Sequence, residues 1–232
     1  MGGFGIWRGS GESGGRGKKR REEKVSPFLI LQIFIGFGFA VSLNPFMMNS
    51  IPVDHVHVLT LGGTIDKDYP KLTSGYAFEF GEKSAAERIL KNHPNLSITY
   101  TFKSICQKDS LEITQQDREA LANSIVDIVE KERHKIPRII VTHGTDTMIE
   151  TALLVKHYLI QRNLTAVIAF TGATKPERFV DSDASFNVGC AIGATSCYSG
   201  FAVLICMNGN VIPAEDCIRD EDSGIFMRAR AN

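Results

Sequence analysis

From residue 54 onward, short runs rich in β-branched and aromatic residues alternate with longer segments in which apolar residues recur three or four apart. The short runs are typical of buried strands and the longer segments of helices. Such alternation favours a parallel sheet with helices on both faces. We therefore expect an α/β fold, a three-layer sandwich with a mainly parallel, flavodoxin- or Rossmann-like sheet, as a single globular domain over residues 54–232. The expected strands are residues 55–61, 97–103, 138–142, 166–171 and 201–206.

Residues 113–134 carry the clearest helical pattern in the chain. Apolar residues recur there at spacings of four, three and one, so that they share one face of the helix. The residues on this face are Leu121, Ile125, Ile128 and Val129. Thr114, with Asp117 three residues later, forms a capping-box pattern that predicts the start of the helix.

Two more helices are expected further along the chain. Thr147 with Glu150 repeats the capping-box pattern, so a helix should begin there. We expect this helix to turn Ala152, Leu153 and Ile160 inward. Residues 184–197 predict a third helix.

Residues 1–53 differ from the rest of the chain in composition. Residues 1–24 are rich in glycine and arginine and can bury little, so we interpret them as disordered. Residues 28–43 are 16 almost wholly apolar residues, fewer than the ~20 that cross a bilayer comfortably. A basic stretch before a short apolar run is typical of a signal peptide or anchor. The alternative is a leader outside the working protein, which would then begin at Met47 or Met48.

The interpretation of this leader decides the expected location of the protein. Without a working signal we expect a cytoplasmic protein. If residues 28–43 act as a signal or anchor, the protein enters the secretory pathway or is held on a membrane. Membrane contact is therefore expected only through an anchor at these residues.

Charge and cysteine content argue against two kinds of partner. The chain has 26 basic and 26 acidic residues and a formal net charge of zero, so its charge gives no reason to expect nucleic acid. The five cysteines include no C-x-x-C spacing, and no cysteine–histidine cluster has the spacing of a zinc site. We expect reduced thiols in a reducing compartment and no metal.

Small, hydroxyl-bearing and acidic residues follow every predicted strand. The carboxyl ends of parallel strands meet at one edge of the sheet, where ligands bind in open α/β folds. Segments that lie far apart in sequence should therefore converge on one site. The segments are GGT (62–64), CQKDSLEIT (106–114), HGTDTM (143–148), TGATKP (171–176) with DSDASFN (181–187), and MNGNVIPAEDCIRD (207–220).

Each of these residues also has an ordinary interpretation. Thr64 can cap a helix that follows the strand, and Asp146 can complement the positive end of the next helix. His143 is typical of a strand-end histidine with its hydrogen bonds satisfied, and Tyr76 can pack on the surface as a loop residue. No G-x-x-x-x-G-K-[ST] or G-x-G-x-x-G pattern occurs, so the glycines do not form a phosphate loop.

Taken together, LGGTID (61–66), HGTDTM (143–148) and the motifs within 171–210 resemble the N-terminal domain of the bacterial-type asparaginase and glutaminase family. HGTDTM after the strand RIIVT is the most specific part. The resemblance covers about residues 55–225 and looks closest to short, single-domain members. It implies an amidohydrolase that converts a side-chain amide into a carboxylate and ammonia, without a metal or organic cofactor.

The resemblance implies catalytic roles for particular residues. Thr64 takes the place of the nucleophile, and Tyr76 takes that of the loop tyrosine that helps to activate it. Thr145 and Asp146 take the places of the second threonine and its aspartate. The family's catalytic lysine falls on Arg219.

Substrate-binding roles are implied for neighbouring residues. Ser110 takes the place of the substrate-holding serine, although Leu111 follows it where larger members have glutamine. We expect Gly63, Glu112 and Gly144 to line the same site. The expected ligand is a small-molecule amide or amino acid, and the resemblance suggests a homodimer.

The implied chemistry is consistent with these residue types. A threonine hydroxyl is a poor nucleophile until a neighbouring group accepts its proton. Two threonines, a tyrosine and an acid–base pair can supply that relay. Backbone N–H groups near Thr64 can form an oxyanion hole, and Asp146 can accept the α-ammonium group of the substrate.

Two departures from the family pattern keep other functions open. Arg219 cannot act as a base, because a guanidinium stays protonated. We also expect no C-terminal domain of the kind that completes the substrate site in larger members. The main expectation is hydrolysis of asparagine or a related amide. The alternative is a catalytically weak module that binds an amino acid or amide, and a third possibility is a flavodoxin-like nucleotide binder, against which the missing phosphate loop counts.

Overall fold

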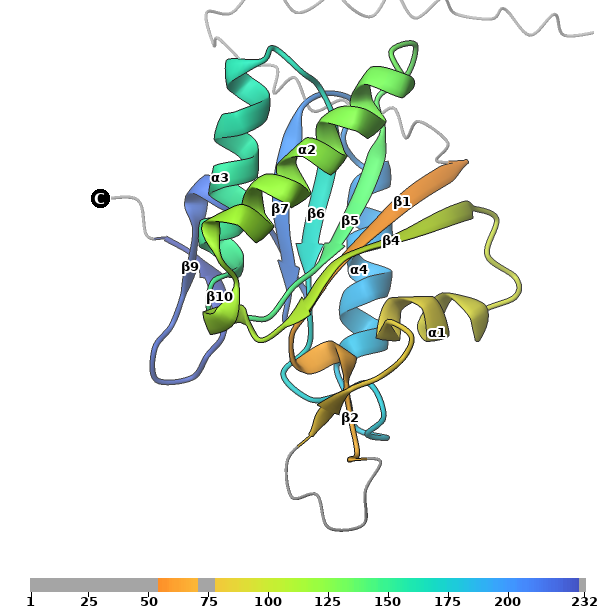
Figure 1. Ribbon diagram of the computed structural model, residues 1–232, viewed down its shortest axis with the longest axis vertical. Helices are drawn as coiled ribbons and strands as arrows, with labels where there is room; N and C mark the ends of the chain where they lie inside the picture. Colours follow the sequence, from red (N-terminus) through yellow and green to blue (C-terminus); the bar gives the residue numbers. More distant parts are fainter. Residues whose placement is uncertain (1–53, 71–77, 230–232) are drawn as a thin grey trace, which may run out of the picture. The chain divides into compact units, whose positions relative to one another are not determined.

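The computed structural model describes residues 54–70 and 78–229, and its main sheet has six strands in the order β4-β1-β5-β6-β7-β8 (Figure 1). All are parallel except β8, which runs antiparallel to β7. The strands are β1 (His55–Gly62), β4 (Thr99–Lys108), β5 (Arg138–Thr142), β6 (Val167–Thr171), β7 (Ala202–Met207) and β8 (Asn210–Pro213). All five predicted strands are present, and β4 continues beyond its predicted end.

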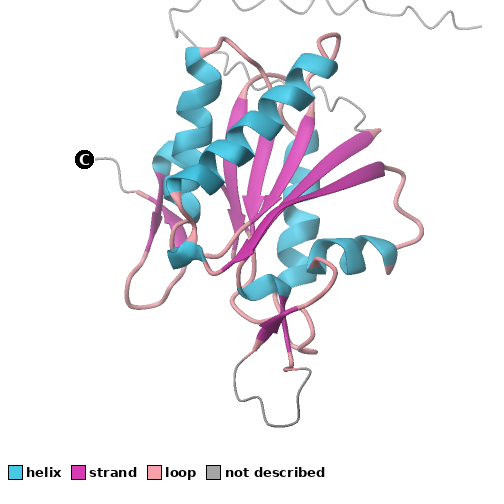
Figure 2. Ribbon diagram, in the orientation of Figure 1, coloured by secondary structure: helices cyan, strands magenta, loops and turns pink. Residues whose placement is uncertain are grey.

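Helices cover both faces of this sheet, which confirms the predicted three-layer α/β sandwich (Figure 2). α2 and α3 pack on one face, and α1 and α4 pack on the other. The helices are α1 (Ala85–Lys91), α2 (Gln115–Lys131), α3 (Met148–Gln161) and α4 (Ala184–Ser196).

The central strands are buried on both sides. In β5, Ile139 and Val141 face α2 and α3, whereas Ile140 between them faces α1 and α4. Successive side chains of a strand point to opposite faces, so a strand covered on both faces is apolar at successive positions along its centre. This explains why β5 and β6 read as continuous apolar runs rather than as alternating patterns.

The connection from β6 through α4 to β7 differs in hand from the other crossovers. α2 and α3 cover one face as the chain moves from β4 to β5 and β6, whereas α1 covers the other face as the chain moves back from β1 to β4. α4 lies on the same face as α1 (Figure 1). The chain nevertheless steps from β6 to β7 in the same direction along the sheet as it steps from β5 to β6 through α3. About 98% of such connections are right-handed. The first three follow this rule, and β6–α4–β7 is left-handed.

The predicted start and face of α2 are confirmed. Thr114 accepts a hydrogen bond from the Asp117 N–H, and the Asp117 carboxylate accepts one from the Thr114 N–H at 2.8 Å. Leu121, Ile125 and Val129 are buried on the predicted face.

The predicted inward face of α3 is partly wrong. Ala152 is buried, but Leu153 is 39% exposed and Ile160 is 55% exposed. The buried apolar side chains of α3 are Met148, Ala152, Val155 and Leu159. Leu153 and Ile160 are seven residues apart and therefore share a side of the helix, but it is the side next to the buried stripe.

Two short hairpins flank the carboxyl edge of the main sheet. One pairs β2 (Lys67–Asp68) with β3 (Glu79–Phe80), and the other pairs β9 (Cys217–Arg219) with β10 (Phe226–Arg228). The first encloses residues 71–77, which lie outside the described residues.

The predictions for residues 1–53 also fall outside the part that the structure describes. Among the described helices, none combines the length and the apolar character that a membrane span requires. The five cysteines are free thiols, of which Cys206 and Cys217 are buried and Cys197 is exposed.

Candidate active site

Tight backbone contacts bring the loops after β1, β4 and β5 together. Gly63 has a φ of 84°, which side-chain-bearing residues rarely adopt. A Cβ on Gly63 would lie 2.4 Å from the Gly144 Cα, and a Cβ on Gly144 would lie 2.7 Å from the Ser110 Cβ. The Gly63 N–H also donates to the Lys108 carbonyl at 2.9 Å. The three loops therefore meet where only glycine fits, at the edge that the motifs predicted.

Thr64 follows this contact directly. It opens the 3-10 helix η2 (Thr64–Asp66), in which Gly63 occupies the cap position and no side chain caps the turn. Thr64 is half-buried, and its hydroxyl makes no hydrogen bond with the described residues. Helix capping, the ordinary interpretation of this threonine, is therefore not its role.

Asp146 is the centre of the polar contacts at this edge. Ser110 Oγ donates to Asp146 Oδ2 at 2.8 Å, and Arg219 Nη1 donates to Asp146 Oδ1 at 2.6 Å. The hydrogen bond from buried Ser110, and then the pairing with Arg219, lower the pKa of Asp146. Its side chain is 47% exposed. Asp146 is therefore a carboxylate at neutral pH, and half of it is open to a ligand.

Arg219 reaches Asp146 from the β9–β10 hairpin. Arg219 Nε donates to the Gly224 carbonyl at 3.3 Å, and the guanidinium carbon lies 5.8 Å from the centroid of the Phe226 ring. These contacts hold the guanidinium in place. The structure thus brings Arg219 to the predicted site, where it supplies a fixed positive charge because it does not release its proton.

The two threonines around Asp146 have different surroundings. Thr145 is half-buried in the loop between Gly144 and Asp146. Thr147 Oγ1 donates to the Ser110 carbonyl at 2.8 Å and makes no cap hydrogen bond. The predicted capping box at the start of α3 is therefore wrong, because this hydroxyl instead ties the loop after β5 to the loop after β4.

His143 has a structural role. It is fully buried, its Nδ1 donates to the Gly144 carbonyl at 2.7 Å, and burial lowers its pKa to about 4. The imidazole is therefore neutral at physiological pH and shielded from solvent. These properties agree with a strand-end histidine rather than with a base. The expectation that its hydrogen bonds are satisfied is wrong at Nε2, which is buried and has no partner among the described residues.

Asp183 holds the loop after β6. Its carboxylate accepts hydrogen bonds from Thr174 N at 2.9 Å and Thr174 Oγ1 at 3.0 Å. Asn187 Nδ2 donates to Asp183 Oδ2 at 2.9 Å and to the Gly172 carbonyl at 3.1 Å. The motifs at 171–176 and 181–187 therefore fix this loop to the start of α4.

Two predicted site residues stand apart from the cluster around Asp146. Glu112 is exposed, and its carboxylate accepts the Asp109 N–H in the capping box of η3 (Ser110–Glu112). A role for Glu112 toward substrate stays a prediction. Tyr76 lies within residues 71–77, outside the described residues.

Sequence reasoning missed an ion pair beside Asp146. Lys67 Nζ lies 2.9 Å from Asp109 Oδ1. After Ser110 and Arg219, the charge of Lys67 also contributes to the low pKa of Asp146. The ion pair could have been suspected because both residues lie close to motifs in the sequence. Lys67 is three residues after Thr64, and Asp109 directly precedes Ser110.

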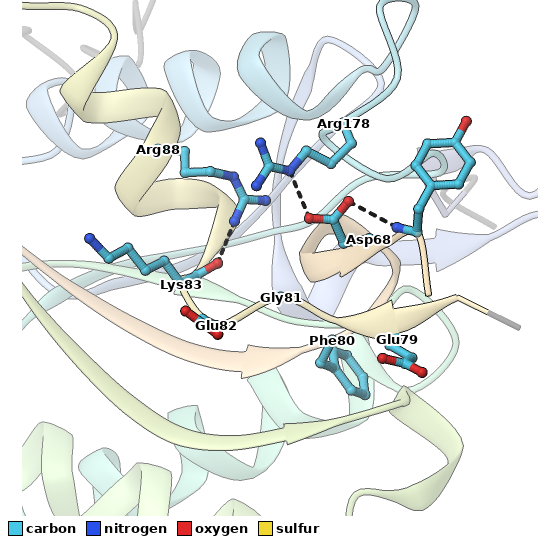
Figure 3. Close-up of a pocket in the computed structure, with 9 residues that line it drawn as sticks. Asp68, Glu79, Phe80, Gly81, Glu82, Lys83, Arg88 and Arg178 are labelled. Carbon is cyan, nitrogen blue, oxygen red and sulfur yellow. Dashed lines mark hydrogen bonds and ion pairs between the residues drawn. The ribbon is translucent and has the colours of Figure 1, made fainter. Parts of the chain in front are cut away.

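A cavity of about 280 Å³ lies beside the β2–β3 hairpin (Figure 3). Its walls include Asp68, which accepts a hydrogen bond from Arg178 Nε at 2.9 Å, and Arg88, which donates to the Lys83 carbonyl. None of Thr64, Thr145 and Asp146 lines it. Within residues 54–70 and 78–229, no group of three or more histidine, cysteine and acidic side chains is placed to hold a metal ion.

Comparison with known proteins identifies one family. The family model described as Asparaginase, N-terminal matches residues 55–224. A glutaminase-asparaginase from Acinetobacter glutaminasificans is 25% identical over 167 residues, which cover 70% of this chain and 49% of the relative.

Solved structures share the fold at low sequence identity. The thermostable L-asparaginase from Thermococcus kodakarensis is 18% identical with a TM-score of 0.59, over 75% of this chain and 51% of that one. A probable cytoplasmic L-asparaginase from Campylobacter jejuni is 21% identical with a TM-score of 0.59, over 75% and 53% of the two chains. The chain thus spans about half the length of the proteins that it matches.

Proposed function

This chain belongs to the asparaginase N-terminal family, and on that premise we propose that it hydrolyses the side-chain amide of asparagine, or of a related small amide, with Thr64 as the nucleophile. The observation that carries the proposal is the contact among three loops. Gly63 lies against Gly144, and Ser110 bonds to Asp146, so the loops that carry Thr64, Thr145 and Asp146 meet at one edge of the sheet, which supports a shared site.

Each group at this point has a chemical task. Thr64 Oγ attacks the amide carbon, and backbone N–H groups of the glycine loops stabilise the oxyanion that forms. The open half of Asp146 binds the α-ammonium group of the substrate, while Ser110 and Arg219 keep this carboxylate ionised and oriented. The hydroxyl proton of Thr64 passes to the amide nitrogen as the carbon–nitrogen bond breaks, so ammonia leaves, and water then hydrolyses the threonine ester to release the acid and restore the hydroxyl.

Ammonia release from asparagine, glutamine and small aliphatic amides tests this function. We expect turnover of at least one of them by the wild-type chain, and a loss on the order of 10³-fold or more in Thr64→Ala, because the nucleophile is removed. Thr165→Ala is the matched control, since Thr165 is exposed and precedes β6 at the opposite edge of the sheet. Full activity in Thr64→Ala would overturn the role of Thr64.

A second candidate function follows from the pairing of Arg219 with Asp146. A fixed guanidinium on the substrate-binding carboxylate favours a site that binds an amino acid but turns it over poorly. Isothermal calorimetry with aspartate and asparagine separates the two candidates. Saturable binding without ammonia release supports the binding module, and rapid turnover excludes it.

A further inference from the structure

The guanidinium of Arg219 keeps a hydrogen-bond donor that the fold does not use. Arg219 donates from Nη1 to Asp146 Oδ1 at 2.6 Å and from Nε to the Gly224 carbonyl at 3.3 Å. Its Nη2 makes no hydrogen bond with the described residues, and the side chain is 32% exposed. A guanidinium donates from all three of its nitrogens, so Nη2 is available to an acceptor from solution.

The carboxylate of Asp146 likewise keeps acceptor capacity. Each of its oxygens accepts one side-chain hydrogen bond, Oδ2 from Ser110 and Oδ1 from Arg219. A carboxylate oxygen has two lone pairs, and this side chain is 47% exposed. Because Asp146 and Arg219 contact each other, an open acceptor and an open donor of opposite charge stand side by side.

The turn of the β9–β10 hairpin fixes the position of the guanidinium. Gly224 has a φ of 70°, and a Cβ on it would lie 3.3 Å from Arg219 Nη2. The Gly224 N–H donates to the Asp220 carbonyl at 2.8 Å, and the Asp220 carboxylate accepts the Ser223 N–H at 2.8 Å. The donor is thus placed before a ligand arrives, which lowers the entropy cost of binding.

The charges around this pair balance one another. Lys67 Nζ lies 2.9 Å from Asp109 Oδ1, and the charge of Lys67 also acts on Asp146. Together with Arg219, these residues form a cluster of two carboxylates and two cations. A cluster without net charge complements a ligand head that carries one charge of each sign better than a simple anion or cation.

We propose that the Asp146–Arg219 pair binds the zwitterionic head of an α-amino acid, with the α-ammonium group on Asp146 and the α-carboxylate on Arg219 Nη2, an inference that rests on the proposed function. Both groups of the head are attached to one carbon, as the two partners of the pair are adjacent. Arg219 is then a specificity-determining residue. The substrate class is free α-amino acids with a side-chain amide, because an amide that lacks the α-carboxylate leaves the guanidinium donor unpaired.

Three amides that differ only in this head test the assignment by their rates of ammonia release. Asparagine has both charged groups, 3-aminopropanamide lacks the α-carboxylate, and succinamate lacks the α-ammonium group. In the wild-type chain we expect kcat/KM for 3-aminopropanamide to be about 10- to 100-fold below that for asparagine, the effect of one lost hydrogen bond between charged groups.

Arg219→Met should remove this preference. We expect kcat/KM for asparagine and for succinamate to fall by about 10- to 100-fold, and that for 3-aminopropanamide to stay the same or rise. Arg219→Lys keeps the charge without the planar fork and should recover part of the loss. Arg228→Met is the matched control, since Arg228 is an exposed arginine on the same hairpin, and all three rates should be unchanged.

Calorimetry measures the same contact without turnover. Aspartate should bind the wild-type chain about 10- to 100-fold more tightly than it binds Arg219→Met. β-Alanine, which is aspartate without its α-carboxylate, should bind both chains equally. Thermal unfolding checks that Arg219→Met is folded, and if it is not, the comparison of ligands on the wild-type chain decides.

The outcomes separate this inference from the function on which it rests. If the wild-type chain releases ammonia equally well from asparagine and 3-aminopropanamide, or if Arg219→Met loses the same factor on all three amides, the carboxylate role of Arg219 is wrong and the proposed function stands. If the wild-type chain releases no ammonia, the proposed function is wrong. Calorimetry then still decides the role of Arg219, which a loss of aspartate binding confined to Arg219→Met supports and equal binding overturns.

Discussion

Asp66 is a buried carboxylate that fastens α1 to the turn of Thr64. Its Oδ1 accepts hydrogen bonds from Ala85 N at 2.6 Å and from Ser84 Oγ at 3.1 Å. The side chain is 1% exposed, and this burial raises its pKa from 3.8 to about 6 despite both hydrogen bonds. The folded state therefore binds this proton more tightly than the unfolded state does. The cost of the buried charge is on the order of 3 kcal/mol above pH 6.

Asp66→Asn should remove this cost and keep both hydrogen bonds on Oδ1. The contribution of wild-type Asp66 to the free energy of unfolding should rise as pH falls from about 6 to about 4, and the variant should lack this rise. Above pH 6 the variant should be at least as stable as the wild type. Urea unfolding at pH 4.5, 6 and 8 measures this, with exposed Asp127→Asn as the control. A wild-type advantage over Asp66→Asn that grows from pH 6 to pH 8 would contradict it.

Residue patterns in the sequence identified part of the candidate site and missed part of it. Thr64, Ser110, Asp146 and Arg219 stand in or next to motifs, and the structure brings their loops to one edge. Lys67 belongs to no motif. Its pairing with Asp109 depends on how the β2–β3 hairpin lies against the loop after β4, and this packing leaves no periodic signal in the sequence.

Among the elements, α2 shows how a local signal fixes a helix. Both hydrogen bonds of its capping box are formed between Thr114 and Asp117. Thr114→Ala should lower the free energy of unfolding by about 1 kcal/mol, because an N–H in the first turn of α2 loses its partner. Chemical unfolding would measure the loss, and Thr165→Ala should change little. Equal stability of both variants would show that the box contributes nothing.

The same signal failed at α3 for a reason outside the helix. The Thr147 hydroxyl is taken by the Ser110 carbonyl, a contact that exists only after the loops have met. The left-handed β6–α4–β7 crossover could not be predicted from the sequence either, because strand and helix patterns do not show on which face of the sheet a connecting helix lies. Element types and the cap of α2 are thus local properties of this sequence, whereas the start of α3 and the handedness of the last crossover depend on tertiary packing.

At the scale of the whole molecule, one sheet edge gathers residues from segments far apart in the chain. The proposed nucleophile comes from the loop after β1, the carboxylate from the loop after β5 and the guanidinium from β9. This chain matches about half of the length of the related proteins, and all three segments lie within the matched part. We propose that this arrangement lets Thr64 form a covalent bond to substrate.

Interception of the threonine ester tests that claim most directly. Hydroxylamine added with asparagine competes with water for the ester and yields aspartyl hydroxamate, which can be followed by its colour with ferric ion. We predict hydroxamate formation by the wild-type chain, rising with hydroxylamine concentration, and its loss in Thr64→Ala. Hydroxamate formation at the wild-type rate in Thr64→Ala, or rapid ammonia release by the wild type with none formed, would contradict a covalent role for Thr64.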